Sequence, residues 1–574
     1  MSDTRNPRNR QDMPMRTETI DRNTAAPLGR GRRIAAVIVI CLAELLVVLD
    51  NTIVNVALPS IGVQTGATMS GLQWIVDAYT LTFAGLLLAF GHLGDRHGRR
   101  RAMVIGLAGI AVMSLGGALA TGLGQLVAAR AAMGICAAAV FPATLALIIN
   151  LLPRGRERAA GIAAWTAMAG FAIAIGPTAG GWLLETFTWH AVFWINVPAA
   201  LAVAAAALAL VPESRVAHSG RLDITGIALS LTGITILVAT IIEAPRYGWT
   251  APITLTGYTV AALVLAAFVW WETRVTAPVL DIRLFTIRRF SLPALAIAVA
   301  YFSMFGFLFM ITQYFQAVRE YSPLEFGIHS LPFAAAVALG APVATLAAQR
   351  LGATAVIVTG LLVLAAGMYI AGQVTVDSPY LGAVLVSMVV MGLGLAVVQG
   401  PATDSIMASV PEDQAGAGSA VNDTTRELGG TLGVAILGSI LGSVYTGRIG
   451  PRIDAVPDAL MNTAQKDIAR HTGLAVLEIN KPEVAPLFAT QKAELVRAMK
   501  IASMDGFHTA SWVTVTAVTL TAVVVAALMP WKPAATALLA WQRTPPRHDD
   551  ADPGPADLAA RPASPPAAAR AWHP

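Results

Sequence analysis

Fourteen stretches of this sequence are each apolar for about 20 residues or more, the length a helix needs to cross a bilayer. They lie at 34–58, 71–91, 102–122, 124–150, 158–184, 189–211, 223–243, 252–271, 291–316, 324–348, 354–374, 380–405, 416–446 and 506–530. Of the 574 residues, 56% are hydrophobic and 13% charged, and the mean hydropathy is +0.64. This composition is too apolar for a soluble globular protein. The sequence therefore predicts an all-α membrane protein with fourteen transmembrane helices.

The arginines indicate the side of each loop, because short loops rich in Lys or Arg stay in the cytoplasm. They cluster before the first apolar run and after the second, fourth, sixth and eighth, whereas loops 59–70 and 122–123 carry no charge. The clusters are Arg30, Arg32 and Arg33; Arg96, Arg99, Arg100 and Arg101; Arg154, Arg156 and Arg158; Arg215 and Arg221; and Arg274, Arg283, Arg288 and Arg289. We expect a protein of the cytoplasmic (inner) membrane with both termini in the cytoplasm.

The order of the spans predicts two six-helix bundles, at 34–211 and 291–530, with two extra central helices at 223–271. Two related halves with a binding site between them is the usual transporter design. Segment 447–505, within the second bundle, is expected on the extracytoplasmic side, with short amphipathic helices at 464–474 and 486–500. The ends, 1–33 and 531–574, have the composition of disordered cytoplasmic tails.

Charge and motif content exclude several functions. The net charge of +5 does not indicate nucleic-acid binding, because the arginines concentrate at helix ends. The sequence has no Gly-x-x-x-x-Gly-Lys-Ser/Thr loop, so ATP hydrolysis is not the energy source. It also has no metal-ligand cluster and no nucleophile elbow. We expect a monomer that is not an enzyme and needs neither metal nor cofactor.

The loop between the second and third apolar runs must reverse the chain within about ten residues, and glycines permit such tight turns. It reads Gly91-His92-Leu93-Gly94-Asp95-Arg96-His97-Gly98-Arg99-Arg100-Arg101-Ala102-Met103. A generic positive turn would explain the arginines but neither the glycine spacing nor Asp95. The pattern closely resembles the signature loop of the major facilitator superfamily of secondary transporters. The resemblance implies a conformational latch, with Asp95 bonded to its own loop and facing a helix end of the other half. The latch residues are Gly91, Gly94, Asp95, Arg96, Gly98, Arg99 and Arg100.

Three further motifs, and one stretch typical of a single branch, occur along the chain in the order that this superfamily has. The stretch 49–59 resembles the first-helix motif of its fourteen-helix drug:proton antiporter branch, and 189–198 is also typical of that branch. The stretch 126–134 resembles the fourth-helix motif, with Arg130 in place and Met133 where glutamine is usual. Gly176, Pro177, Gly180 and Gly181 resemble the fifth-helix motif of exporters, although Ala172 replaces its leading glycine. Such glycines let neighbouring helices approach closely.

Several acidic residues fall inside the apolar runs, where a carboxylate costs about 2.5–3.5 kcal/mol. Glu44, Asn51 and Asn55 recur at i, i+7 and i+11 and form one polar stripe, which Asp50 flanks. Asp77 and Arg130 fall, like Asp50, in the outer half of the bilayer by helical rise. The resemblance implies that Arg130 takes part in proton coupling with a nearby carboxylate. The alternatives are interhelical hydrogen bonds for the stripe and a static buried ion pair for Arg130.

Two further groups have more than one interpretation. Aromatic and amide side chains near the ninth run suit an adaptable substrate cavity, or else face lipid. With the stripe asparagines, the cavity residues would be Asn51, Asn55, Tyr301, Phe305, Gln313 and Gln316. The second group, Asp404, Asp423, Arg426 and Glu427, is either an interhelical gate or a hydrated cluster at helix ends.

The chain is thus expected to be a proton-driven antiporter that exports amphipathic toxic compounds by alternating access. Cationic or neutral substrates suit the acidic groups, although Arg130 and Arg426 keep anions open. The alternatives are an exporter of an endogenous lipid or secondary metabolite, and a membrane sensor or membrane-embedded enzyme built on a transporter fold. A sensor would not need the membrane carboxylates, whereas an exporter should stall when they are neutralised.

Overall fold

The structure of the protein is a computed structural model. It describes residues 29–153, 155–215, 222–276, 278–410, 415–457, 461, 463–471, 473–474, 476–477 and 491–531. Most of the two predicted tails lies outside these residues, as do Arg154 and Arg221. The described part is almost entirely helical and contains 14 helices long and apolar enough to cross a membrane. The predicted fold class and number of spans are therefore confirmed.

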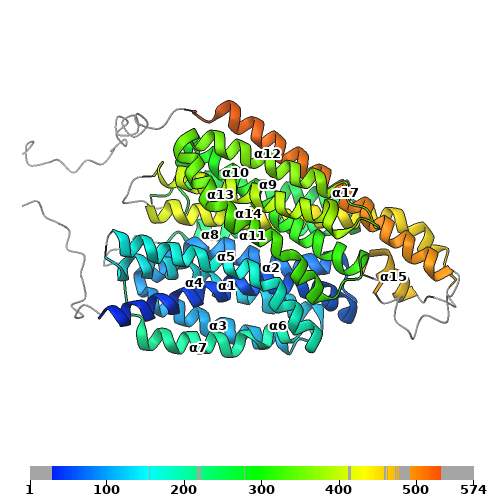
Figure 1. Cartoon of the computed structure of the whole chain (residues 1–574), viewed down its shortest axis with the longest axis horizontal. Coiled ribbons are helices and arrows are strands. Elements are labelled where there is room, and N and C mark those ends of the chain that lie inside the picture. Colours follow the sequence, from blue (N-terminus) through cyan, green and yellow to red (C-terminus); the bar gives the residue numbers. More distant parts are fainter. Residues whose placement is uncertain are drawn as a thin grey trace, which may run out of the picture. The chain divides into compact units, whose positions relative to one another are not determined.

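The first seven helices form one half of the molecule (Figure 1). They are α1 (Arg30–Thr65), α2 (Met69–His97), α3 (Arg99–Ala118), α4 (Leu123–Leu151), α5 (Arg156–Thr186), α6 (Ala191–Trp194) and α7 (Asn196–Leu210). The inserted pair is α8 (Ile224–Tyr247) and α9 (Pro252–Glu272). The span expected at 189–211 is thus two helices, with only Ile195 between α6 and α7.

The second half follows the 3₁₀ helix η1 (Ile282–Thr286). Its helices are α10 (Arg288–Gln313), α11 (Pro323–Leu351), α12 (Ala353–Ala371), α13 (Leu385–Met407), α14 (Ala415–Asp454), α15 (Thr463–His471) and α17 (Gln491–Leu528), with π-helical turns η2 (Tyr314–Val318) and η3 (Tyr380–Val384).

The segment between the last two spans differs from its prediction. A short helix near 464–474 is confirmed as α15. The second predicted helix is not separate, because residues 491–500 are the first turns of the long helix α17, while 486–490 lie outside the described residues. Both α14 and α17 continue past their apolar parts, and Tyr445, Ile449 and Met499 pack in a small apolar cluster between them and α15.

We call the end of the bundle where α1 begins and α2 meets α3 the arginine end, and the opposite end the far end. The halves meet mainly through two helix pairs, α2 with α14 and α5 with α11, and to a lesser extent through α1 with α10 and α11. Gln73 Nε2 donates to the carbonyls of Val434 and Ala435, at 3.0 and 2.7 Å. Gln316 Nε2 donates to Val56 O at 2.9 Å. These residues lie toward the far end of their helices, so the halves are joined there.

The inserted pair lies against the α2–α14 junction. Leu81 of α2, Ile241 of α8 and Ala435 of α14 belong to one apolar cluster. Trp74 Nε1 donates to Glu243 of α8 at 3.3 Å. On the other half, Ser439 Oγ donates to Ile241 O at 2.9 Å. Helix α8 therefore contacts both halves of the molecule.

Candidate functional site

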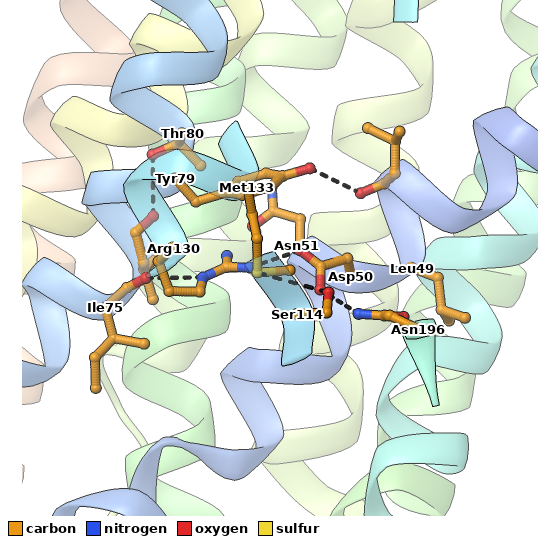
Figure 2. Close-up of polar contacts among 12 residues, drawn as sticks. Leu49, Asp50, Asn51, Ile75, Tyr79, Thr80, Ser114, Arg130, Met133 and Asn196 are labelled. Carbon is orange, nitrogen blue, oxygen red and sulfur yellow. Dashed lines mark hydrogen bonds and ion pairs between the residues drawn. The ribbon is translucent and has the colours of Figure 1, made fainter. Parts of the chain in front are cut away.

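A buried ion pair lies inside the first half (Figure 2). Arg130 Nη1 on α4 is 2.6 Å from Asp50 Oδ2 on α1, and the two side chains are 0% and 2% exposed. Arg130 Nε also donates to Ile75 O on α2 at 3.1 Å. The expectation that Asp50 and Arg130 lie at the same depth is confirmed. The two groups of a buried pair stay charged only when hydrogen bonds replace the water that they lose on burial.

Two residues that the sequence analysis did not select complete this site. Asn196, at the start of α7, donates from Nδ2 to Asp50 Oδ1 at 2.6 Å. The Tyr79 ring lies 4.2 Å from Arg130 Cζ, and its hydroxyl donates to Val47 O at 3.2 Å. The sequence signal for Asn196 is its amide side chain within the apolar run 189–211, since an amide at membrane depth needs a partner. Met133 accepts a weak hydrogen bond from Ser114 Oγ at 3.8 Å.

Asp77 does not join this ion pair. It is 0% exposed, and neither carboxylate oxygen has a hydrogen-bond partner among the residues that the structure describes. Gln73 and Thr80, four residues before it and three after, bond to α14 through Val434 O and Thr431 Oγ1. Positions i, i+4 and i+7 share one helix face, so Asp77 lies on the side of α2 that packs against α14. It therefore belongs to the junction between the halves.

A second charged cluster lies between the halves. Glu44 is 0% exposed, and in the described part of the chain neither of its oxygens has a hydrogen-bond partner. It interacts electrostatically with Asp423, Arg426 and Glu427 of α14. Arg426 Cζ lies 4.7 Å from the centre of the Tyr301 ring. The cluster holds three carboxyl groups and one guanidinium, so a cation bound there would be favoured electrostatically.

The gate hypothesis needs correction at Asp404. Arg426 Nη1 is 3.5 Å from Asp423 Oδ1, so this ion pair lies within α14 and not between helices. Asp404 is exposed, and among the described residues it forms no ion pair. The other three members interact electrostatically with Glu44 of the opposite half.

The predicted cavity residues do not form a single site. Asn51 and Asn55 are buried, and their side-chain oxygens have no hydrogen-bond partner within the described ranges. Phe305 packs against Gly430, near the level of Tyr301. Gln316 instead joins the halves toward the far end through Val56, and Gln313 lines a small pocket there with Met69 and Phe507. The two glutamines therefore lie at a different level of the molecule from Tyr301 and Phe305, and the lining of a substrate cavity by these residues stays a prediction.

The loop expected to be a latch is held by its own half. Asp95 Oδ1 accepts from Arg99 Nε at 2.6 Å, which confirms its bond within the loop. The expected contact of Asp95 with the other half is not found among the described residues. Glu213, which follows α7, instead accepts from the Arg100 backbone at 3.0 Å. Gly98 has φ +120°, and a side chain there would meet the Glu213 carboxylate at 2.8 Å.

The remaining latch residues lie around this turn, and within the described part of the chain no hydrogen bond or ion pair joins them to the other half. Gly91 faces Pro142, Gly94 faces Ala102, and Arg96 is exposed. Glu213 escaped the sequence analysis, although an acid beside so many arginines was a usable signal.

The glycines of the fifth-helix motif make the close contacts that were predicted. A methyl group at Gly176 would overlap Thr52 Oγ1, and one at Gly180 would lie 2.8 Å from Ile53, so both allow α1 to approach. A methyl group at Gly181 would overlap the backbone of Pro323 on α11. Pro177 lies inside α5, and its carbonyl faces Gly327. This motif therefore joins α5 both to its own half and to the other.

Comparisons with known proteins agree with this arrangement. A family model described as Major Facilitator Superfamily matches residues 40–434. The chain is 35% identical over 424 residues to "Multidrug resistance protein Stp" of Mycobacterium tuberculosis, covering 74% of this chain and 79% of that protein. It is 34% identical over 450 residues to "Tetracenomycin C resistance and export protein" of Streptomyces glaucescens, covering 77% and 82%.

Solved structures are similar in fold alone. One is a bacterial homologue of the human lysosomal transporter Spinster, in an inward-facing and unoccupied conformation. Its TM-score is 0.63 at 16% identity, covering 89% of this chain and 100% of that one.

Among the described residues, no group of three or more His, Cys, Asp or Glu is placed to hold a metal ion.

Proposed function

This chain belongs to the Major Facilitator Superfamily, and we propose that it is a proton-coupled antiporter that exports amphipathic small molecules. The observation that carries the proposal is the Asp50–Arg130 pair, which lies at membrane depth with one further side-chain bond, from Asn196. A carboxyl group there can hold a proton or a paired charge, and exchange between the two states couples proton flow to conformation. One charge moving down the membrane potential supplies about 2.3 kcal/mol per 100 mV.

The substrate would bind between the halves, beside Glu44 and Tyr301. Glu44 offers two buried oxygens without partners, and Tyr301 offers an aromatic ring. A carboxylate next to an aromatic face suits an organic cation with an apolar body. In this assignment the arginine end faces the cytoplasm, both termini lie there, and the joined far end faces outward. Rocking about the junctions would alternate access.

A second substrate class is favoured by one comparison. The relative from Streptomyces glaucescens is named for the resistance and export of tetracenomycin C. Export of a secondary metabolite would use the same halves and the same proton site. Competition between tetracenomycin C and a cationic dye for uptake would distinguish one shared cavity from two.

Transport into inverted membrane vesicles tests the proposal. With an imposed pH gradient, acidic inside, wild-type vesicles should take up a cationic dye such as ethidium. Asp50→Asn should abolish this uptake while the protein still inserts, because asparagine cannot exchange a proton. Glu157→Gln, which removes an exposed acid from the same half, serves as the control and should retain uptake. Equal pH-driven uptake by Asp50→Asn and wild type would refute proton coupling at this site.

A further inference from the structure

The inserted helices carry two buried acids that the proposed transport mechanism does not use. Asp223 immediately precedes α8, and Glu272 is the last residue of α9, so the antiparallel pair brings both to the arginine end. Their side chains are among the buried polar groups, with 9% and 4% exposed. The two helices pack closely, since a methyl group at Gly233 of α8 would lie 2.8 Å from Leu265 of α9. The start of α8 and the end of α9 therefore lie side by side.

The two carboxyl groups meet beside the backbone of Gly226. A methyl group at Gly226 would overlap Glu272 Oε1 and would lie 2.5 Å from Asp223 Oδ2, so the two oxygens border the same small space. Two negative charges there would repel strongly, because buried charges are poorly screened by water. The site therefore needs a proton or a positive charge between the two oxygens.

The neighbouring charged groups do not remove this repulsion. Glu272 interacts electrostatically with Asp223 and with Asp281, an acid in the loop after α9. Arg274 is the arginine nearest to Glu272 in the sequence, and its Cζ lies 4.5 Å from the centre of the Trp270 ring. Among the residues that the structure describes, neither Asp223 nor Glu272 forms an ion pair. No described basic side chain therefore neutralises the pair.

The hydrogen bonds distinguish the two acids. Asp223 Oδ1 accepts from Gly226 N at 2.9 Å, and Trp271 Nε1 lies 3.0 Å from each carboxyl oxygen of Asp223. Glu272 Oε2 accepts from Leu280 N at 3.3 Å, whereas Oε1 has no hydrogen-bond partner in the described part of the chain. N–H donors stabilise an ionised carboxylate, and a protonated carboxyl group has one O–H to donate. Asp223 therefore has the surroundings of the ionised member, and Glu272 those of the protonated one.

We propose that Asp223 and Glu272 share one proton, carried on Glu272 Oε1 and donated to Asp223 Oδ2. This acid pair would be a pH-dependent clasp that joins α8, α9 and the loop after α9. Water at the arginine end can supply the proton, because Thr273, Arg274 and Thr276 of that loop are exposed. When this water becomes alkaline, the proton leaves, the two carboxylates repel and the clasp opens.

The clasp lies between the two halves of the molecule. Glu272 holds the backbone of Leu280, and the chain continues from there through η1 into α10 of the second half. Helix α8 also contacts the first half near the arginine end, where a methyl group at Gly85 of α2 would lie 2.6 Å from Leu231. Opening the clasp would therefore release one end of a helix pair that contacts both halves.

A divalent cation would also neutralise two carboxylates, but the coordination does not suit one. Mg²⁺ and Ca²⁺ take about six or more oxygen ligands. Both oxygens of Asp223 already accept hydrogen bonds, and Asp281 Oδ1 accepts from Arg283 N at 3.0 Å. A proton needs only the two oxygens that meet at Gly226, so it fits this site better.

Unfolding of the full chain in detergent micelles at pH 6 and pH 9 tests the shared proton. Glu272→Gln keeps a side chain of the same size that can donate to Asp223 but cannot ionise. The folded wild type holds a proton that the unfolded chain releases, so its stability should fall as the pH rises. The unfolding constant of wild type, divided by that of Glu272→Gln, should therefore rise about tenfold or more between the two pH values.

The matched control for this measurement is Glu157→Gln, which neutralises an exposed acid of the first half. The unfolding constant of wild type divided by that of Glu157→Gln should be the same at both pH values. No rise in the ratio for Glu272→Gln, or an equal rise for Glu157→Gln, would overturn the shared proton.

Cysteine labelling locates the change and distinguishes a proton from a cation. In a Cys41→Ser/Cys136→Ser background, a cysteine at half-buried Val279 is labelled with a water-soluble maleimide, and one at exposed Thr273 corrects for ionisation of the thiol. The corrected rate at Val279 should rise about fivefold from pH 6 to pH 9, and should stay constant when Glu272→Gln is added. A constant rate in the parent background contradicts the clasp. Restoration of the slow rate at pH 9 by Mg²⁺ would assign the site to a cation and overturn the proton.

Discussion

Replacing Asp50 by asparagine removes one charge from a pair that is almost fully buried. Arg130 would keep its bond to Ile75 O and its contact with the Tyr79 ring, but its Nη1 would lose the carboxylate at 2.6 Å. Its Nη2 already lacks a partner. Removing one member of a buried ion pair costs about 3–5 kcal/mol, because the other charge remains without water or counter-ion. We expect Asp50→Asn to destabilise the protein by that amount.

A double-mutant cycle separates the ion pair from other effects of substitution. Arg130→Gln removes the second charge, so Asp50→Asn/Arg130→Gln leaves a neutral pair that can still form hydrogen bonds. The double variant should be more stable than the sum of the single changes predicts, by about 2–3 kcal/mol, the upper part of the range for residues in contact. Reversible unfolding in mixed detergent micelles gives the free energies.

The chain supplies a matched control for this cycle. Arg33 Nη1 and Glu157 Oε2 also join two helices of the first half, at 3.3 Å, but their side chains are 28% and 57% exposed. Because water screens such a pair, Glu157→Gln should cost about 1 kcal/mol or less. If Asp50→Asn lowers the free energy of unfolding no more than Glu157→Gln does, or if the cycle shows no coupling energy, then the buried ion pair does not contribute the stability that its geometry indicates.

Two further predictions concern the joints around the site. Gly181→Ala should cost about 1–3 kcal/mol by overpacking α5 against Pro323, and should slow dye uptake. Gly170→Ala, on the same helix with open space around it, should leave the rate of dye uptake unchanged. Equal rates of dye uptake for Gly181→Ala and Gly170→Ala would contradict this account. Glu213→Ala removes the acceptor of the Arg100 N–H at the start of α3 and should lower stability in unfolding measurements by about 0.5–2 kcal/mol. An unchanged free energy of unfolding would remove Glu213 as the cap.

The sequence predicts how deep a residue lies along its helix, but not which neighbouring helix its side chain faces. The helical rise places Asp50 and Arg130 at one level, and their ion pair confirms it. The same calculation cannot show that Asp77 faces α14, because the rotation of a helix depends on what packs around it. Gln313 was grouped with Tyr301 because both lie on one apolar run. They are twelve residues apart, or about 18 Å along a helix, and so belong to different levels of the molecule.

Partners from distant parts of the chain were the hardest to predict. Asn196 and Glu213 act through Asp50 and Arg100, which lie 146 and 113 residues away in sequence. Both differ in chemistry from the residues around them. Asn196 is an amide within an apolar run, and Glu213 is an acid near several arginines. That contrast marks a residue as needing a partner, but one sequence does not say which.

The two charged clusters constrain how proton and substrate would be coupled. Among the described residues, the side chains bonded to Asp50 are Arg130 and Asn196 of its own half, so a rigid rocking movement would not break the pair with Arg130. Glu44 faces α14, so the same movement would change its surroundings at once. The two acids are six residues apart on α1, about 9 Å along the helix and 120° around it. Under the proposed function, Asp50 binds the proton and Glu44 lies beside the substrate, so the two acids need not compete for the same ligand. Coupling would then pass through the position of α1, with the proton acting on one face of this helix and the substrate on another.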